Sequence, residues 1–264
     1  MRRLFVYSTA ATLMAVCGGL WAGEVEDKAL AILEKSKDTV VTVELVLKQK
    51  FSMEGMDTQE NEEKLEATGT VIDAQGLTVL ALSSTDPSSL YASMMDMEPG
   101  FKVDSEVSDA KILLGNGKEV PAQIVLRDVD LDLAFLRPLT KPEAPFAFVD
   151  LNAAVQAKLL DQLVTLNRLG KVANRVYSVS LERIEAIVDK PRMFYIPGND
   201  PTHTAQGSPA FALDGNIVGI FVIRVIKSTG GGGMMGGDSN MASILLPAAD
   251  IAEGAKQAPG FDGK

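Results

Sequence analysis

The chain has 264 residues, of which 46% are hydrophobic, so it can bury a core as one large or two small domains and is not globally disordered. Its formal net charge is −10. An acidic chain without a basic run is a poor nucleic-acid binder, so we attribute the charge to solubility.

The first residues are typical of a signal peptide. Arg2 and Arg3 precede an apolar stretch that ends in small residues at Ala22. We predict a cleaved signal peptide over residues 1–22, a mature chain that begins at Gly23, and a periplasmic or secreted protein. If the segment is retained, it is instead a membrane anchor, and this would be the chain's only contact with a membrane.

Cysteine and histidine are too scarce for a classical metal site. Cys17, the only cysteine, lies within the predicted signal peptide, and Val16 precedes it where a lipoprotein signal has a small residue. The mature chain then has no thiol, and its only histidine is His203. We therefore expect no disulfide, no classical zinc site and no cofactor.

Helical periodicity is confined to the two ends of the chain. Residues 24–38 carry apolar residues at helical spacing, and a second helix is expected to start near Pro247. Between them lie short apolar runs separated by turns, at 39–48, 67–73, 77–82, 111–114, 119–128, 131–138, 162–169, 175–188, 192–197 and 217–226. This pattern predicts an antiparallel barrel or sandwich.

Three stretches lack any period. Residues 52–66 are acidic and predict an exposed loop, residues 83–100 predict a Met-rich surface loop with a short helix, and residues 228–240 predict a flexible glycine-rich loop. By contrast, the dipeptide Asn116-Gly117 favours a hairpin with a type I′ turn, because that turn needs positive φ angles.

Four segments, in chain order, resemble the bacterial HtrA/Deg type of trypsin-fold serine protease. Residues 67–85 resemble the strand pair that leads to the catalytic histidine, residues 112–138 the hairpin and the triad aspartate, residues 204–220 the nucleophile's turn, and residues 243–251 the closing strand and helix. The resemblance covers about residues 26–256 and leaves no segment for a PDZ domain.

The resemblance implies an all-β fold of two antiparallel six-stranded β-barrels with short N- and C-terminal helices. Within one protease-fold domain at 23–256, barrel 1 is expected at about 38–140 and barrel 2 at about 145–247, followed by a tail at 257–264.

The same resemblance assigns the triad positions. The histidine falls on Ser83, or on Ser84 if the alignment shifts by one residue, the acid on Asp132 and the nucleophile on Gln206. Thr204 stands where a glycine N–H lines the oxyanion hole. A hydroxyl is not a base near neutral pH and an amide is not a nucleophile, so we expect no catalytic residue.

Two alternatives concern single residues. Ser208 becomes a nucleophile if two glycines of the motif are deleted, although His203 lies on the same loop and not on barrel 1, from which the family's base comes. Without a histidine partner, Asp132 would instead accept backbone N–H groups.

Other chemistry is not supported by the spacing of the residues. Ser108 and Lys111 have the spacing of a Ser-Lys dyad by chance, ahead of a strand, and Asp128 and Asp130 lack the pattern of a calcium loop.

We therefore predict a catalytically inactive serine-protease homologue that binds a peptide or protein partner through the former substrate cleft, with residues 229–240 near that cleft. One alternative is an active serine endopeptidase that uses Ser208. The other is a structural protein of the cell envelope with no binding cleft.

Overall fold

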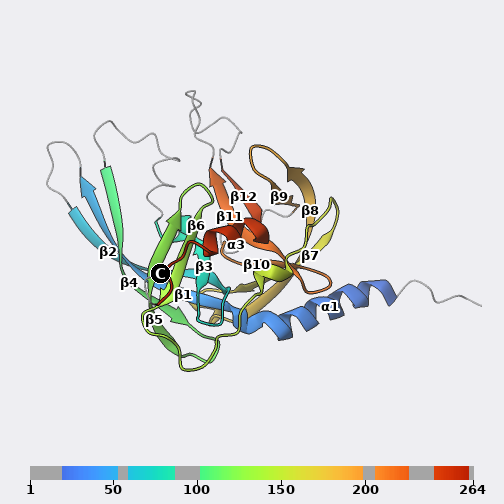
Figure 1. Ribbon diagram of the computed structural model, residues 1–264, viewed down its shortest axis with the longest axis horizontal. Coiled ribbons are helices and arrows are strands. Elements are labelled where there is room, and N and C mark those ends of the chain that lie inside the picture. The colour runs from blue at the N-terminus through green and yellow to red at the C-terminus, as the bar shows by residue number, and fades with distance from the viewer. Residues whose placement is uncertain (1–19, 53–58, 87–101, 199–205, 226–240, 262–264) are drawn as a thin grey trace, which may run out of the picture.

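Two closed antiparallel barrels of six strands each pack side by side (Figure 1). The computed structural model describes residues 20–52, 59–86, 102–198, 206–225 and 241–261. The predicted fold class is confirmed.

Barrel 1 is built around side chains that alternate between its inside and its outside. It consists of β1 (Val40–Ser52), β2 (Gln59–Val71), β3 (Thr78–Ala81), β4 (Lys102–Leu113), β5 (Glu119–Asp128) and β6 (Leu133–Pro138), in the order β1-β2-β3-β6-β5-β4. Its interior is filled by small and branched apolar residues, among them Val43, Leu45, Ile112 and Leu136. Such residues favour strands because they pack well on a pleated surface.

Barrel 2 repeats this plan. It consists of β7 (Gln162–Arg168), β8 (Tyr177–Val188), β9 (Phe194–Pro197), β10 (Pro209–Ala212), β11 (Ile217–Val225) and β12 (Met241–Pro247), in the order β10-β11-β12-β9-β8-β7. Leu163, Tyr195, Phe221 and Leu245 pack in its interior.

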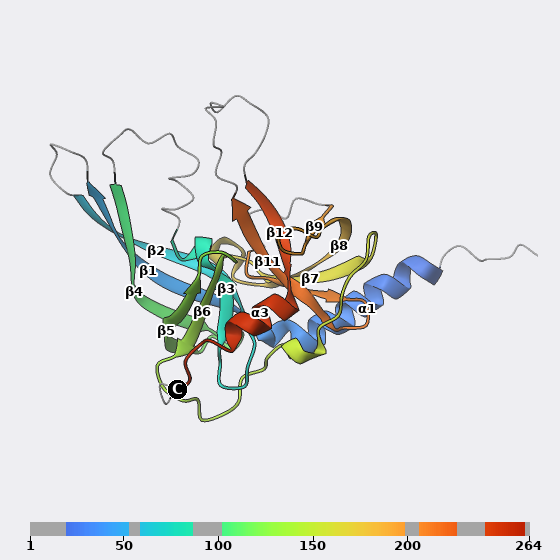
Figure 2. The same ribbon diagram turned by 45° about the horizontal axis from the view of Figure 1, so that its top comes forward.

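A third apolar cluster lies between the barrels and joins the two terminal helices to them. Ile32 of α1 (Leu20–Ser36), Phe135 of β6, Val222 of β11 and Ile251 of α3 (Ala248–Ala255) belong to it. Helix α3 follows β12 directly, with Pro247 as its N-cap residue (Figure 2). None of the helices in the described part of the chain is long and apolar enough to cross a membrane.

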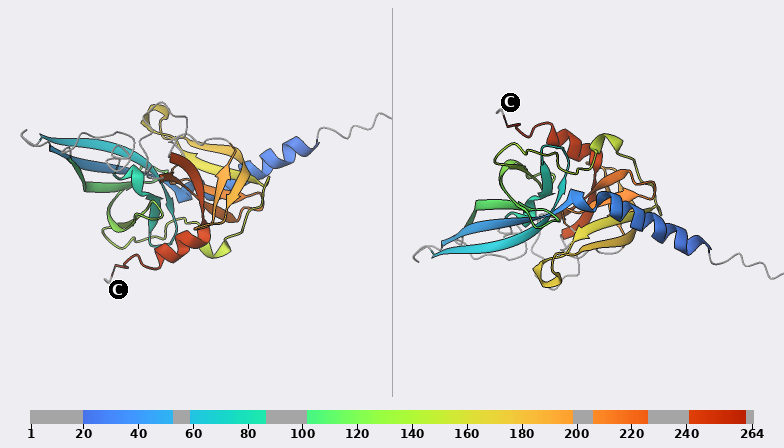
Figure 3. Two further views of the ribbon diagram at one scale, coloured as in Figure 1. Left: turned by 90° about the horizontal axis from the view of Figure 1, so that it is seen from above. Right: turned by 90° about the horizontal axis from the view of Figure 1, so that it is seen from below.

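Strands β1, β2 and β4 extend beyond barrel 1 as a three-stranded sheet at one end of the molecule, while α1 points away at the other end (Figure 3). The expectation of an acidic loop at 52–66 is wrong for its second half, because β2 begins at Gln59 and pairs with β1 from Phe51↔Gln59 to Val40↔Thr70. Backbone pairing holds this strand even though its side chains there are exposed.

The β4–β5 hairpin also differs from its prediction. Gly117 has φ +82°, but Asn116 is not among the residues with positive φ, so the turn is not type I′. Gly117 N–H donates to Leu114 O and Leu114 N–H to Lys118 O. This is the pattern of a three-residue loop, in which a glycine in the left-handed region follows a type I turn.

Candidate functional site

The turn between β5 and β6 carries Asp132 to the boundary between the barrels. Asp132 has φ +55°, a left-handed conformation that aspartate tolerates. It faces the short 3₁₀ helix η2 (Leu82–Ser84), where its Oδ1 accepts from Ser83 N–H at 2.7 Å and its Oδ2 from Ser83 Oγ at 2.9 Å. Oδ2 also accepts from Ile223 N–H of β11 at 3.0 Å, so one carboxylate links both barrels.

Burial dominates the electrostatics of Asp132. Burial raises the pKa of this carboxyl from 3.8 to about 6, although the hydrogen bonds from Ile223 and Ser83 act in the opposite direction. At neutral pH the group is therefore mostly ionised, and it is held by three donors rather than by a cation.

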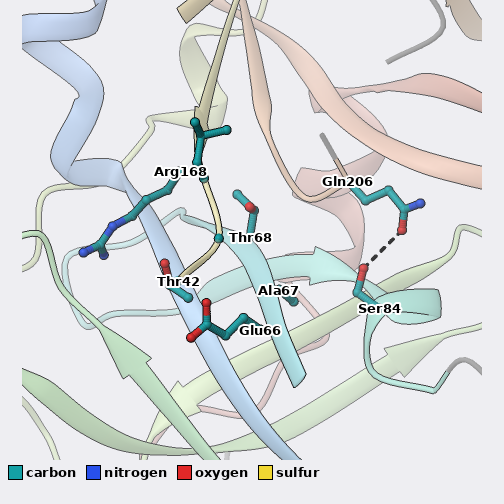
Figure 4. Close-up of a pocket in the computed structure, with 9 residues that line it drawn as sticks. Thr42, Glu66, Ala67, Thr68, Ser84, Arg168 and Gln206 are labelled. Atoms are coloured by element: carbon teal, nitrogen blue, oxygen red, sulfur yellow. Dashed lines mark hydrogen bonds between the residues drawn. The ribbon is translucent and has the colours of Figure 1, made fainter. Parts of the chain in front are cut away.

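Gln206 comes to the same place from barrel 2. Its Oε1 lies 3.1 Å from Ser84 Oγ and 3.4 Å from Ser83 Oγ, and Figure 4 shows the Ser84 contact. Ser83 has one hydroxyl proton, and its shorter contact is the one to Asp132. The hydroxyl that donates to Gln206 is therefore that of Ser84. The structure thus brings Ser83, Ser84, Asp132 and Gln206 together.

Ser208 does not belong to this hydrogen-bonded group. It is 0% exposed, and its Oγ has no hydrogen-bond partner in the described part of the chain. Its carbonyl accepts from Phe221 N–H at 3.0 Å, which pairs it with a residue of the barrel 2 interior. No hydrogen bond joins Ser208 to Asp132 or to Ser83 among the described residues.

Gly207 fixes the approach of this segment to barrel 1. It has φ +82°, and a Cβ atom built on it would lie 2.0 Å from the backbone oxygen of Thr68. Thr70 Oγ1 donates to Gly207 O at 2.7 Å. Only glycine fits here, because a side chain would meet immovable backbone.

A pocket of about 220 Å³ opens beside Gln206 and Ser84, where the two barrels meet. Barrel 1 and η2 contribute Thr42, Glu66, Ala67, Thr68 and Ser84, and barrel 2 contributes Arg168, Leu169, Gly170 and Gln206. Thr68 Oγ1 crosses to Asn167 Oδ1 at 2.8 Å and so closes the inner wall between the barrels.

Sequence reasoning missed the pocket residues other than Ser84 and Gln206. Thr42 alternates with the inward-facing Val41 and Val43 of β1, a pattern typical of a residue that faces solvent, yet only 4% of it is exposed. No local pattern links it to Arg168, which approaches it through the packing of the two barrels.

Several predicted residues take structural roles or lie outside the described residues. Ser108 Oγ donates to Val46 O, Lys111 pairs with Glu119, and Asp128 Oδ1 accepts from the N–H groups of the turn that follows it. His203, Thr204 and residues 229–240 lie outside the described residues. Within those that are described, no group of three or more His, Cys, Asp or Glu side chains could hold a metal ion.

Comparison with known proteins gives one family and one fold. The sequence model of the trypsin-like peptidase domain matches residues 67–220. Among solved structures, the apo-form crystal structure of the MamO protease domain from Magnetospirillum magneticum is similar with a TM-score of 0.53 and 15% identity, covering 83% of this chain and 96% of that chain. At this identity the likeness concerns the fold alone. The comparison with curated proteins gave no match.

Proposed function

Because the chain belongs to the trypsin-like peptidase domain family, we propose that it is a member that has lost hydrolysis and binds an extended peptide segment of a partner protein between its barrels, in the periplasm or outside the cell. The observation that carries this proposal is the contact of Asp132 with the Ser83 hydroxyl and of the neighbouring Ser84 with the Gln206 amide.

The chemistry of these groups does not support acyl transfer. Serine-protease chemistry needs a base that takes the nucleophile's proton and a carboxylate that orients the base. Ser83, next to Asp132, offers a hydroxyl, which does not accept a proton near neutral pH, and Gln206 offers an amide, which does not attack a carbonyl. Ser208 is fully buried, and its Oγ forms no hydrogen bond with Asp132 or any other described residue, which supports the same conclusion.

The geometry for strand addition is present on β11. The backbone of Phe221 points away from β12, because its N–H and C=O bond Ser208 and Gly207. Ile223 N–H points the same way, to Asp132. By alternation the backbone of Val225 also points away from β12, on a side where the described residues place no strand. An extended chain can pair there through backbone hydrogen bonds, which need no catalytic group.

Export of the chain rests on the predicted signal peptide. Helix α1 runs through the expected cleavage point after Ala22, yet the buried residues that fix it, Ala29 and Ile32, lie beyond that point. Cleavage would leave these contacts intact. Mass spectrometry of the protein from the envelope fraction should give a chain that begins at Gly23, and an intact Met1 would instead support the membrane anchor.

Peptide selection tests the binding function. Random peptides displayed on phage should yield ligands for the mature chain. Val225→Pro should abolish their binding, because it removes an N–H that β12 does not use, whereas Val225→Ala should preserve it. Failure to select any peptide would favour the structural envelope protein. Equal binding by Val225→Pro would exclude strand addition on β11.

A fluorophosphonate probe tests the loss of hydrolysis. The native chain should not be labelled at neutral pH. Labelling that disappears in Ser208→Ala would contradict the proposal and establish the endopeptidase that uses Ser208.

A further inference from the structure

The pocket between Thr42 and Gln206 has features that the loss of a catalytic site does not explain. From its donors and its charges we infer that it binds a carboxylate group of the bound peptide, supplied either by the peptide's C-terminus or by an acidic side chain. This rests on the proposed function in that the carboxylate belongs to a peptide held between the barrels.

The first feature is the hydroxyl of Thr42. The residue lines the pocket and is 96% buried, as its 4% exposure shows, and its Oγ1 has no hydrogen-bond partner within the described residues. A buried donor without a partner costs about 1–3 kcal/mol. Thr68, opposite Thr42 on β2, is by contrast satisfied by Asn167. The Thr42 hydroxyl is thus a donor that a ligand in the pocket can satisfy.

The second feature is the positive charge of Arg168. Its guanidinium donates to the backbone carbonyls of Leu113, Leu114 and Arg175 and lies 5.5 Å from the ring centroid of Tyr177. These partners are neutral, and none of the described carboxylates forms an ion pair with Arg168. Its charge therefore stays uncompensated beside the pocket.

The one carboxylate of the pocket lining, Glu66, already has partners. Arg175 forms an ion pair with Glu66 Oε1, and Lys171 N–H donates to Glu66 Oε2 at 3.2 Å. Both oxygens of Glu66 are thus occupied, and its charge is offset by the ion pair with Arg175. Glu44 lies opposite Glu66 on β1 but does not line the pocket. With Glu66 paired, the charge of Arg168 is the one in the pocket lining that no ion pair among the described residues offsets, in a chain whose net charge is −10.

Gln206 lines the end of the pocket opposite to Thr42. In Figure 4, Thr42, Glu66 and Arg168 lie on one side of Thr68, and Ser84 and Gln206 lie on the other. Because Oε1 of Gln206 accepts from Ser84, the N–H donors of its Nε2 are left to bind a peptide that runs past η2. A carboxylate bound near Thr42 therefore lies to one side of Gln206, which occupies the position of the family's nucleophile.

Nuclear magnetic resonance of the isotope-labelled mature chain tests the inference with small probes. N-acetylalanine presents a terminal carboxylate and N-acetylglutamate α-amide a side-chain carboxylate, and N-acetylalanine amide and N-acetylglutamine amide are their neutral counterparts. One or both acids should shift the amide signals of Thr42 and Gly170 in a saturable way, and the neutral amides should not. The acid that binds identifies the source of the carboxylate.

Thr42→Val should weaken binding of the acid about tenfold, the effect expected for one hydrogen bond to a charged group. Thr165→Val is the matched control, because Thr165 is also 4% exposed and lacks a partner for its hydroxyl in the described residues, but does not line the pocket. Lys171→Glu, on the exposed loop, should weaken binding about threefold at low salt and less at high salt.

Three results would overturn the inference: no shift with either acid, equal shifts with the neutral amides, or equal weakening by Thr42→Val and Thr165→Val. The selected peptides would then still bind between the barrels, and the proposed function would stand. If no peptide can be selected but an acid titrates the pocket as expected, the proposed function fails while the pocket remains a carboxylate site.

Discussion

The carboxylate of Asp132 accepts hydrogen bonds from both barrels. Because it is buried, its ionisation lowers the free energy of unfolding at neutral pH. Its pKa of about 6 in the folded chain lies above its ordinary value of 3.8. The folded state therefore binds this proton more tightly than the unfolded state. The contribution of Asp132 to the free energy of unfolding is highest below about pH 4 and falls as the pH rises through 6.

Chemical unfolding at several pH values tests this contribution. Between pH 7 and pH 4 the native chain should gain on the order of 2 kcal/mol from Asp132. Other carboxylates add their own pH dependence, so the quantity to compare is the difference from Asp132→Asn, which cannot titrate there. Parallel pH profiles for the two chains would contradict the raised pKa.

The approach of Gly207 to Thr68 gives a second test at the level of one residue. Gly207→Ala should cost about 3 kcal/mol or more, because the new methyl group meets the Thr68 carbonyl and the φ angle is left-handed. Gly117→Ala is the control, since Gly117 has the same φ of +82° and open space around it. It should cost only about 1 kcal/mol. Equal losses in urea unfolding would show that backbone conformation alone matters at Gly207.

At the scale of elements, the end of β7 is tied to the β4–β5 hairpin of the other barrel by one side chain. Arg168 donates to Leu113 O and Leu114 O. Arg168→Met keeps the stem but removes these hydrogen bonds, and should lower the free energy of unfolding by about 2 kcal/mol. Arg127→Met, on the exposed side of β5, should change it by less than about 0.5 kcal/mol. Equal losses in the free energy of unfolding for the two variants would show that the hydrogen bonds of Arg168 do not stabilise the contact between the barrels.

Strands with one buried face could be predicted from the sequence, and the outer half of β2 could not. In β1, Val43 and Leu45 stand on either side of the polar Glu44 because both face the inside of barrel 1. In β2, residues 59–64 are exposed on both faces, so no alternation marks them as a strand. These residues form a strand because they pair with β1, and only the three-dimensional register reveals this pairing.

The residues of the candidate site also divide into those that the sequence predicts and those that it does not. Asp132 and Gln206 were found because they occupy fixed positions in an ordered series of motifs. The missing partner of Thr42 and the uncompensated charge of Arg168 depend on which residues meet across the barrels, 126 positions apart (168 − 42). No spacing along the chain encodes that meeting.

At the scale of the whole molecule, the central apolar cluster couples both barrels and both helices into one unit. Ile251 of α3 is fully buried in this cluster. Ile251→Ala should cost about 3 kcal/mol through the cavity it leaves. Hydrogen exchange followed by mass spectrometry should show β1 and β8 losing protection together.

An exposed apolar residue on the other helix is the control. Leu30 of α1 is 53% exposed, and Leu30→Ala should change the free energy of unfolding by less than about 1 kcal/mol. Loss of protection in barrel 2 alone after Ile251→Ala would show that the barrels unfold as separate units.

The contact between Gly207 and the Thr68 carbonyl also bears on how this domain changes over evolutionary time. A residue that performs chemistry is free to vary once the chemistry has no use, but Gly207 is required by the meeting of the two barrels. A saturation-mutagenesis library sorted for soluble expression should therefore accept many residues at 206 and almost none at 207. Members of the family that keep this junction of the barrels should then be recognisable by the glycine, whatever residue precedes it.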